Sequence, residues 1–271
     1  PLAATPLNIP AGTDPRETLA EWLLTPENPF LARAMANRVW GQFLGRGIVH
    51  PVDDFRATNP PVNPELLDAL AADFAGHDFD LRHLMRRIMN SRLYQLSSLP
   101  NKTNVQDTSS FSRFYRRRIS AENLHDILVQ VSGVESGFNN LRRDARSVEL
   151  WTTRMDSALL ESFGLPNSSE NCPVERDDRP SMVQALHLMN SDKLQAKLAD
   201  KNGRAAKLGQ ADRPSDEVVS ELYLALYSRW PSDEEKRIAI ESLEAGSPKR
   251  QQAVEDIIWA LINTAEFVFN H

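Results

Sequence analysis

Apolar residues recur three and four positions apart over most of the chain, and residues that cap helices precede most of these stretches. This spacing places apolar side chains on one face of a helix, whereas a half-buried strand would show alternation. In the N-terminal half, helices are predicted to follow five capping residues: Asp14, Asn28, Asn63, Asp80 and Ser120. The second of these helices is expected to end at Gly45 or Gly47, because glycine readily adopts the left-handed conformation that ends helices.

The same pattern continues in the C-terminal third of the chain. Further helices are predicted at Ser181, Ser191, Ser215 and Ser232, and a last one at Ser247. Only residues 147–153 resemble a strand. The sequence therefore predicts a mainly α fold, an irregular multi-helix domain with long ordered loops and at most a minor β element.

The division of the chain follows from the same pattern. Residues 1–13 are expected to form a linker and residues 14–271 a single mostly helical domain, with 96–146 as the interval in which a sub-boundary would fall. Stretches 48–62, 96–118 and 164–180 are irregular, and loops of this length are often functional or disordered.

The composition is that of an ordinary globular protein, with 41% hydrophobic and 25% charged residues and a formal net charge of −6 over 271 residues. The single cysteine, Cys172, excludes an internal disulfide framework and any site built from several thiolates. No apolar run of about 18 residues is present, so no membrane span is predicted. The chain begins at Pro1 rather than at a methionine, so a preceding segment is expected.

The second predicted helix carries polar residues on an otherwise apolar surface. Arg33 and Asn37 lie four positions apart on one side, and Arg38 lies on another. A buried guanidinium is costly unless it is paired. One interpretation is an anion or substrate site on Arg33 and Asn37. The other, which we favour, is a structural network with carboxylates such as Asp53, Asp54, Glu122 or Glu175.

Candidate catalytic groups are few and scattered. Asp53 and Asp54 form the best carboxylate pair on a loop, but the spacing of a calcium loop is absent, so no metal site is predicted. The favoured interpretation is a helix cap or a partner for Arg38 or Arg46. No two of the six histidines are four positions apart. An enzyme would have to draw its acid or base from Asp53, Asp54, Glu122 or His187.

Positive charge is concentrated in residues 82–118, where nine basic residues face Asp107 alone. Arginines and aromatic residues alternate at its end, and such a surface is typical of sites for nucleic acids or anionic glycans. The candidate polyanion surface comprises Arg113, Arg116, Arg117 and Arg118. The alternative is that this basic segment docks on the acidic C-terminal helices of the same chain.

Long motifs along the chain resemble a family of planctomycete C-terminal domains, the domain of unknown function 1553. These motifs are NPFLAR (28–33), NRVW (37–40), FLGRGIV (43–49), DDF (53–55), PELLD (64–68), SRLYQLS (91–97), RRISAE (117–122), FG (163–164), QALHLMN (184–190), WALIN (259–263) and FNH (269–271). The resemblance covers roughly residues 14–271. It carries no agreed activity.

The resemblance implies a domain context and a cellular location rather than an enzymatic activity. Such domains resemble the C-terminal module of large exported proteins, preceded by a cytochrome c-like domain, which implies a periplasmic or cell-surface location. Haem would be bound upstream, and no cofactor is expected in this domain. The family loop usually reads Cys-x-Cys-Glu-Arg, but Val174 stands here at the second cysteine, which argues against a dithiol or metal role and leaves Glu175 and Arg176 as the retained part.

These observations lead to three hypotheses of function. The preferred one is a non-catalytic interaction or scaffold domain whose partners are the upstream domains of the same polypeptide, another protein or an anionic glycan. Its internal polar network would comprise Arg33, Asn37, Arg38, Asp53, Asp54, Glu122, Glu175 and Arg176. The alternatives are a hydrolase-like domain acting on an anionic or carbohydrate substrate, and a polyanion-binding module.

Overall fold

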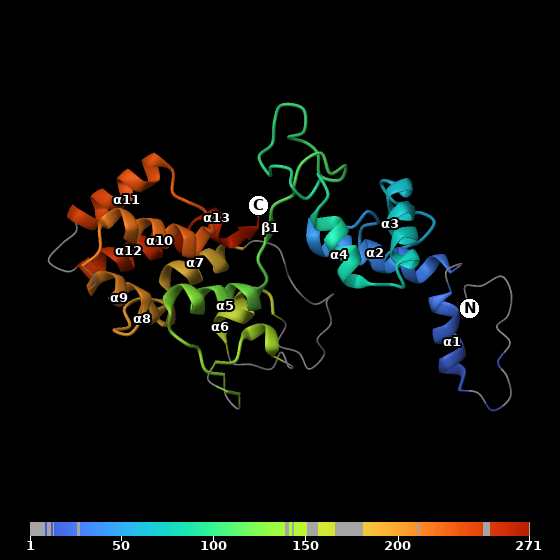
Figure 1. Cartoon of the computed structure of the whole chain (residues 1–271), viewed down its shortest axis with the longest axis horizontal. Coiled ribbons are helices and arrows are strands. Elements are labelled where there is room, and N and C mark those ends of the chain that lie inside the picture. Colours follow the sequence, from blue (N-terminus) through green and yellow to red (C-terminus); the bar gives the residue numbers. More distant parts are fainter. Residues whose placement is uncertain are drawn as a thin grey trace. The chain divides into compact units, whose positions relative to one another are not determined.

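The computed structural model describes residues 9, 12, 14–25, 28–138, 141–142, 144–150, 157–165, 181–210, 212–245 and 250–270 (Figure 1). The chain divides into two compact units, one comprising the described residues up to Arg117 and the other residues Arg118–Asn270, each with its own hydrophobic core. This division falls within the 96–146 interval, while the expectation of a single domain stays a prediction.

The described residues are mainly helical, so the predicted fold class is confirmed. The β structure found there is one pair of two-residue strands, β1 (Arg117–Arg118) and β2 (Phe269–Asn270). No helix in the described part of the chain is long and apolar enough to cross a membrane.

The described residues of the N-terminal unit form four helices: α1 (Pro15–Leu24), α2 (Pro29–Leu44), α3 (Pro64–Gly76) and α4 (Leu81–Met89). Each begins where the sequence predicts, because the preceding Asp or Asn side chain accepts a hydrogen bond from a backbone N–H of the first turn. Gly45 ends α2 in the left-handed conformation, with φ 77°.

The core of the N-terminal unit lies between α2, α3 and α4. Trp40 and Leu44 of α2 are buried together with Leu67 and Phe74 of α3 and Leu84 of α4. The outer side of α2 is more exposed than its apolar composition suggests, since Phe30 is 41% exposed. Helix α2 therefore buries a face rather than its whole circumference.

The irregular segment before residue 118 is ordered by its own polar groups. The Asp107 carboxylate accepts hydrogen bonds from the backbone N–H groups of Ser109, Ser110 and Ser112. The Ser112 hydroxyl also donates to this carboxylate and makes the largest contribution to its pKa. Together these hydrogen bonds hold the pKa of Asp107 well below its usual range. The turn carries Phe111 into the core, where its ring meets that of Trp40 edge to face.

The C-terminal unit is built from shorter elements. They are α5 (Ala121–Ser132), a 3₁₀ helix (Ser147–Glu149), α6 (Ala158–Ser162), α7 (Met182–Asn190), α8 (Asp192–Leu198), α9 (Arg204–Gln210), α10 (Ser215–Tyr227), α11 (Asp233–Ala245), α12 (Arg250–Ile262) and α13 (Ala265–Val268). Helices α6, α9 and α13 were not predicted. The predicted start at Ser247 lies outside the described residues.

The strand expected at 147–153 is wrong over its described part. Residues Ser147–Glu149 form a 3₁₀ helix, and residues 151–153 lie outside the described residues. The Asp126 carboxylate of α5 accepts hydrogen bonds from the backbone N–H groups of Ser147 and Val148. Asp126, 21 residues before Ser147, therefore binds the backbone N–H groups that a strand would donate to a neighbouring strand.

Helices α9 and α12 approach each other closely at a glycine. A Cβ atom placed on Gly209 would lie 2.5 Å from the Cα of Gln251 and 2.7 Å from its backbone nitrogen. Both distances are far below van der Waals contact, so only glycine fits at this crossing without movement of a helix.

Arg229 joins three elements of the C-terminal unit. Its guanidinium donates to the Glu235 carboxylate of α11 at 2.7 Å and to the Glu266 carboxylate of α13 at 2.6 Å. It also lies 5.3 Å from the centre of the Tyr227 ring. Glu235 in turn accepts from the Ser232 N–H at the predicted helix start, as the glutamate of a capping box does.

This ion pair makes the stability of the C-terminal unit dependent on pH. The hydrogen bond from Arg229 lowers the pKa of Glu235 to about 2, against about 4.3 for an unfolded chain. The stabilisation is therefore present above about pH 4.3 and is lost as the pH falls through about 2. We expect Glu235→Gln to be less stable than the wild type at pH 6 by about 1 kcal/mol, and by much less at pH 2.5. Urea unfolding at both values measures this, and an equal difference at the two would contradict it.

Candidate functional site

Asn37 is fully buried and holds the loop that follows α2. Its Nδ2 donates to the carbonyl oxygens of Val49, at 2.9 Å, and Val52, at 2.7 Å, while its Oδ1 accepts from the Val49 N–H at 2.8 Å. Both amide hydrogens are used in these bonds. Asn37 therefore stabilises the loop from inside the core and offers no donor to a ligand.

The charged candidates near Asn37 form three separate ion pairs. Arg33 pairs with Asp68 of α3 at 3.0 Å, Arg38 with Asp53 at 2.7 Å and Asp54 with Arg56 at 2.9 Å. The pairing of Arg38 with Asp53 confirms the favoured interpretation of that carboxylate. Arg33 and Asn37 are engaged by different neighbours, Arg33 by Asp68 of α3 and Asn37 by the loop after α2.

The four catalytic candidates do not converge within one unit. Asp53 and Asp54 belong to the N-terminal unit, whereas Glu122 and His187 belong to the C-terminal unit. Glu175, Arg176 and Cys172 lie outside the described residues.

His187 lines a cavity of about 460 Å³ in the C-terminal unit, together with His125 and Lys197. Burial lowers the pKa of all three, and it is the largest cause in each case. The Nδ1 of His125 lies 2.6 Å from the Ser147 hydroxyl, and Lys197 donates to the Val134 carbonyl at 2.9 Å. The described lining does not include Glu122, so this cavity does not unite that carboxylate with His187.

The arginines of the candidate polyanion surface have different neighbours. Arg113 donates to the Ser98 carbonyl and Arg116 to the Ser98 hydroxyl. Arg117 donates to the Gln42 carbonyl, and burial lowers its pKa. Arg118 belongs to the C-terminal unit, where its guanidinium lies 5.4 Å from the centre of the Phe163 ring.

Two of these four arginines share a hollow in the N-terminal unit. We call it the arginine pocket: a cavity of about 450 Å³ whose lining includes Arg46, His50, Arg113 and Arg116, together with Asp107. The prediction of a polyanion surface stays a prediction, and within the N-terminal unit this pocket is where it would apply.

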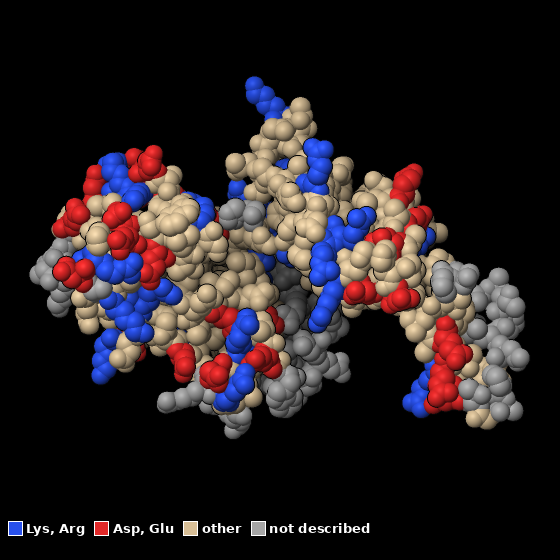
Figure 2. Space-filling view, viewed as in Figure 1, with Lys and Arg blue, Asp and Glu red and all other residues tan. Residues whose placement is uncertain are grey.

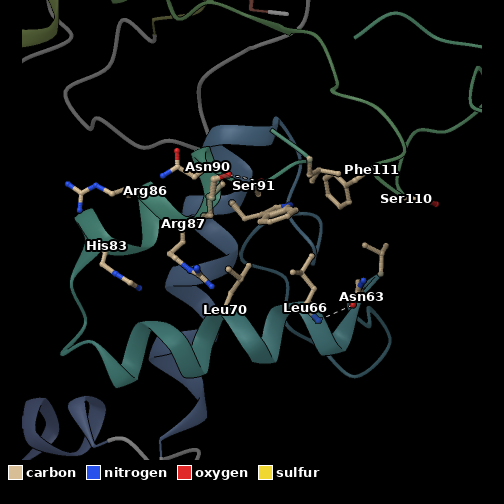
Figure 3. Close-up of a pocket in the computed structure, with 14 residues that line it drawn as sticks. Asn63, Leu66, Leu70, His83, Arg86, Arg87, Asn90, Ser91, Ser110 and Phe111 are labelled. Carbon is tan, nitrogen blue, oxygen red and sulfur yellow. Dashed lines mark hydrogen bonds between the residues drawn. The ribbon is translucent and has the colours of Figure 1, made fainter. Parts of the chain in front are cut away.

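A larger cavity, the α3–α4 pocket, lies in the same unit and measures about 850 Å³. Its apolar lining includes Trp40, Leu66, Leu70, Ile88 and Phe111. Its basic lining is His83, Arg86 and Arg87, and the described lining includes no carboxylate. In Figure 3 the three basic side chains extend from α4, while Leu66 and Leu70 follow α3 and Phe111 lies at the other end.

The positive charge of this pocket is only partly compensated. His83 Nε2 lies 2.8 Å from an Asp73 carboxylate oxygen, and Arg87 Nε lies 3.6 Å from the same carboxylate. Arg86 forms no ion pair with the described residues. On the face drawn in Figure 2, basic side chains gather over α4, whereas both signs are mixed over α11 and α12.

The residues of the α3–α4 pocket are not among the candidates predicted from the sequence. The one usable signal was the pattern of α4, in which Arg86 and Arg87 stand between the buried residues Leu84 and Ile88. The apolar wall comes from α2, α3 and the turn at Phe111, which are brought together only by folding.

Comparison with known proteins gives one family. The family described as "Protein of unknown function (DUF1553)" matches residues 15–243. No curated protein and no solved structure matches the chain. The match covers most of the chain and confirms the resemblance to this family that the motifs predicted.

Proposed function

The chain belongs to the family of proteins of unknown function DUF1553, and we propose that it serves as a non-catalytic binding domain. Its α3–α4 pocket takes an anionic ligand that also has an apolar body. The observation that carries this proposal is the lining of the pocket, in which Arg86 and Arg87 adjoin an apolar wall and the described lining includes no carboxylate.

The pocket chemistry favours this class of ligand. Cavities of about 300–1,000 Å³ with a mostly apolar lining and a few polar groups are typical of small-molecule sites. The 850 Å³ volume lies in this range. Arginine binds carboxylate, sulfonate and phosphate groups through a planar fork of donors, and Leu66, Leu70 and Phe111 offer apolar contacts to the rest of the ligand.

The contacts of the candidate binding and catalytic residues on α2 and its following loop support a binding rather than an enzymatic role. The side-chain amide of Asn37 is engaged in hydrogen bonds with the backbone, and Arg38 and Asp53 form an ion pair. Asp54 pairs with Arg56. A general acid or base must reach the proton it transfers, and these contacts give the named groups structural partners instead. The hydrolase-like function stays a prediction.

The wider setting is proposed from the sequence motifs alone. We place the domain in a larger exported protein, at a periplasmic or cell-surface location, with the upstream domains of that polypeptide as partners. Haem would be bound in an upstream domain and no cofactor in this one. A polyanion-binding function is the second candidate, supported by the three arginines that line the arginine pocket.

The dye 1-anilinonaphthalene-8-sulfonate tests the α3–α4 pocket, because it joins a sulfonate to an apolar aromatic body. We expect the folded chain to bind it, and Arg87→Gln to weaken binding by about tenfold, the equivalent of one charged hydrogen bond. Dye fluorescence titration measures both. The melting temperature of each variant shows that the fold is retained.

Arg82→Gln is the matched control. Arg82 is an exposed residue of the same helix and does not line the pocket. We expect this variant to bind the dye as the wild type does. Equal weakening by the two substitutions would mean that the dye responds to overall charge, and the proposal would then be abandoned.

A further inference from the structure

We propose that Asp73, His77 and His83 bind a divalent transition-metal ion, with Zn²⁺ as the best fit. One ligand atom from each residue can be chosen so that all three lie within 4.8 Å of one another. The three residues come from the last turn of α3, the residue after α3 and the first turn of α4. The inference does not depend on the proposed function.

The connection between α3 and α4 brings the two imidazoles together. Asp78 and Phe79 both have positive φ angles, 52° and 56°, which is uncommon for residues other than glycine. Phe79 is held there because its N–H donates to the Phe74 carbonyl and its ring meets that of Phe74 edge to face. In the resulting turn the rings of His77 and His83 stack with their centres 3.7 Å apart.

The hydrogen bond of His77 determines which of its nitrogens is free. Its Nδ1 lies 2.7 Å from the Asp73 carbonyl oxygen, which can only accept, so Nδ1 carries the proton. In the neutral ring the lone pair is then on Nε2. Histidines that bind metals commonly donate their other N–H to a carbonyl or carboxylate in this way.

The imidazole of His83 is already hydrogen-bonded to the Asp73 carboxylate. His83 Nε2 lies 2.8 Å from Asp73 Oδ2. A metal ion bound between these two atoms would replace that proton, as metals do when they bind histidine and carboxylate ligands. Two nitrogens and one oxygen suit Zn²⁺, and three protein ligands leave a fourth position for water or a ligand.

The local charges both favour and oppose a cation. Asp78 and Asp80, in the same turn, add negative charge to that of Asp73. Arg87 opposes the cation, since its Nε lies 3.6 Å from Asp73 Oδ2. The Arg87 side chain is 65% exposed, so it can turn into solvent when the metal binds. Removing Arg87 is therefore expected to strengthen metal binding.

The same contacts also fit a purely structural cluster, in which His77 caps α3 and His83 pairs with Asp73. Titration of the untagged, metal-free chain with Zn²⁺ in a calorimeter at pH 7.5 distinguishes the two. We expect one ion per chain and a higher melting temperature. His77→Gln should weaken binding by about tenfold or more, and Arg87→Gln should strengthen it severalfold.

His50→Gln is the matched control, since His50 belongs to the same unit and lies outside the cluster. His77 is half exposed, so His77→Gln is expected to fold even where His83→Gln is not. Co²⁺ in place of Zn²⁺ should give the visible absorption of a tetrahedral site. Absence of binding, or binding that His50→Gln weakens as much as His77→Gln does, would overturn the proposal and leave the cluster structural.

Discussion

Replacement of Asn37 by alanine is expected to lower the free energy of unfolding of the N-terminal unit by about 3 kcal/mol. The variant loses three hydrogen bonds, two to carbonyl oxygens and one from the Val49 N–H. Val49 is 1% exposed, so its backbone groups have no water to replace the lost amide. The large effect comes from these buried groups left without partners rather than from the side chain removed.

Urea unfolding measures the change, and tryptic cleavage after Arg56 reports on the loop. We expect faster cleavage in Asn37→Ala, because Asn37 fixes the loop to α2 through Val49 and Val52. Gln42→Ala on the same helix is the control, since that side chain is exposed and should be replaced at little cost. If the two variants are equally stable, Asn37 has no structural role and becomes available again as a ligand-binding residue.

Gly209→Ala is the second substitution with a large expected effect. The added methyl group would lie 2.5 Å from the Gln251 Cα, so α9 and α12 must move apart. Overpacking of this kind costs about 1–3 kcal/mol and occasionally more. Alanine favours the helix over glycine by up to about 1 kcal/mol, which offsets part of the cost. We expect a net loss of about 2 kcal/mol in the free energy of unfolding of the C-terminal unit.

Gly76→Ala separates the steric effect from helix propensity. Gly76 is also helical, but a Cβ there would meet no atom within 4 Å. We expect this variant to be as stable as the wild type or slightly more stable in urea unfolding. A Gly209→Ala variant that behaves in the same way would show that α9 and α12 have room between them.

The helix starts were predictable because their causes are local. Asn28, Asn63 and Ser181 each accept a hydrogen bond from a backbone N–H two or three residues later. A cap, its first turn and its apolar spacing all lie within a few positions of the sequence. The same holds for Gly45 at the end of α2, where the left-handed conformation of one residue ends the helix.

The elements that were missed have causes elsewhere in the chain. Helix α9 has a small-residue surface whose glycine fits against α12, about 40 positions later. Helices α6 and α13 have five and four residues, too short to show a clear apolar period. The expected strand was wrong because the Asp126 carboxylate captures the N–H groups of Ser147 and Val148.

The candidate sites also divide into contacts that the local sequence predicts and contacts that only folding creates. The pairing of Arg38 with Asp53 could be expected, because the carboxylate lies in the loop directly after the helix that carries the arginine. The partner of Arg33 is Asp68 on α3, which only the packing of α3 against α2 brings within 3.0 Å. The proximity of His77 and His83 could not be predicted from the sequence either, since two residues with positive φ angles bring their rings together.

The sequence by itself determined the helical class, the capped helix starts and the family, because each depends on residues close together in the chain or on motifs read in order. Tertiary structure decided which polar groups are neutralised and which remain at a cavity. Asn37, which the sequence offered for binding, is enclosed by the loop it supports. Arg86 and Arg87, which it did not select, line a cavity whose apolar wall comes from α2, α3 and the turn at Phe111, and folding alone brings these segments together.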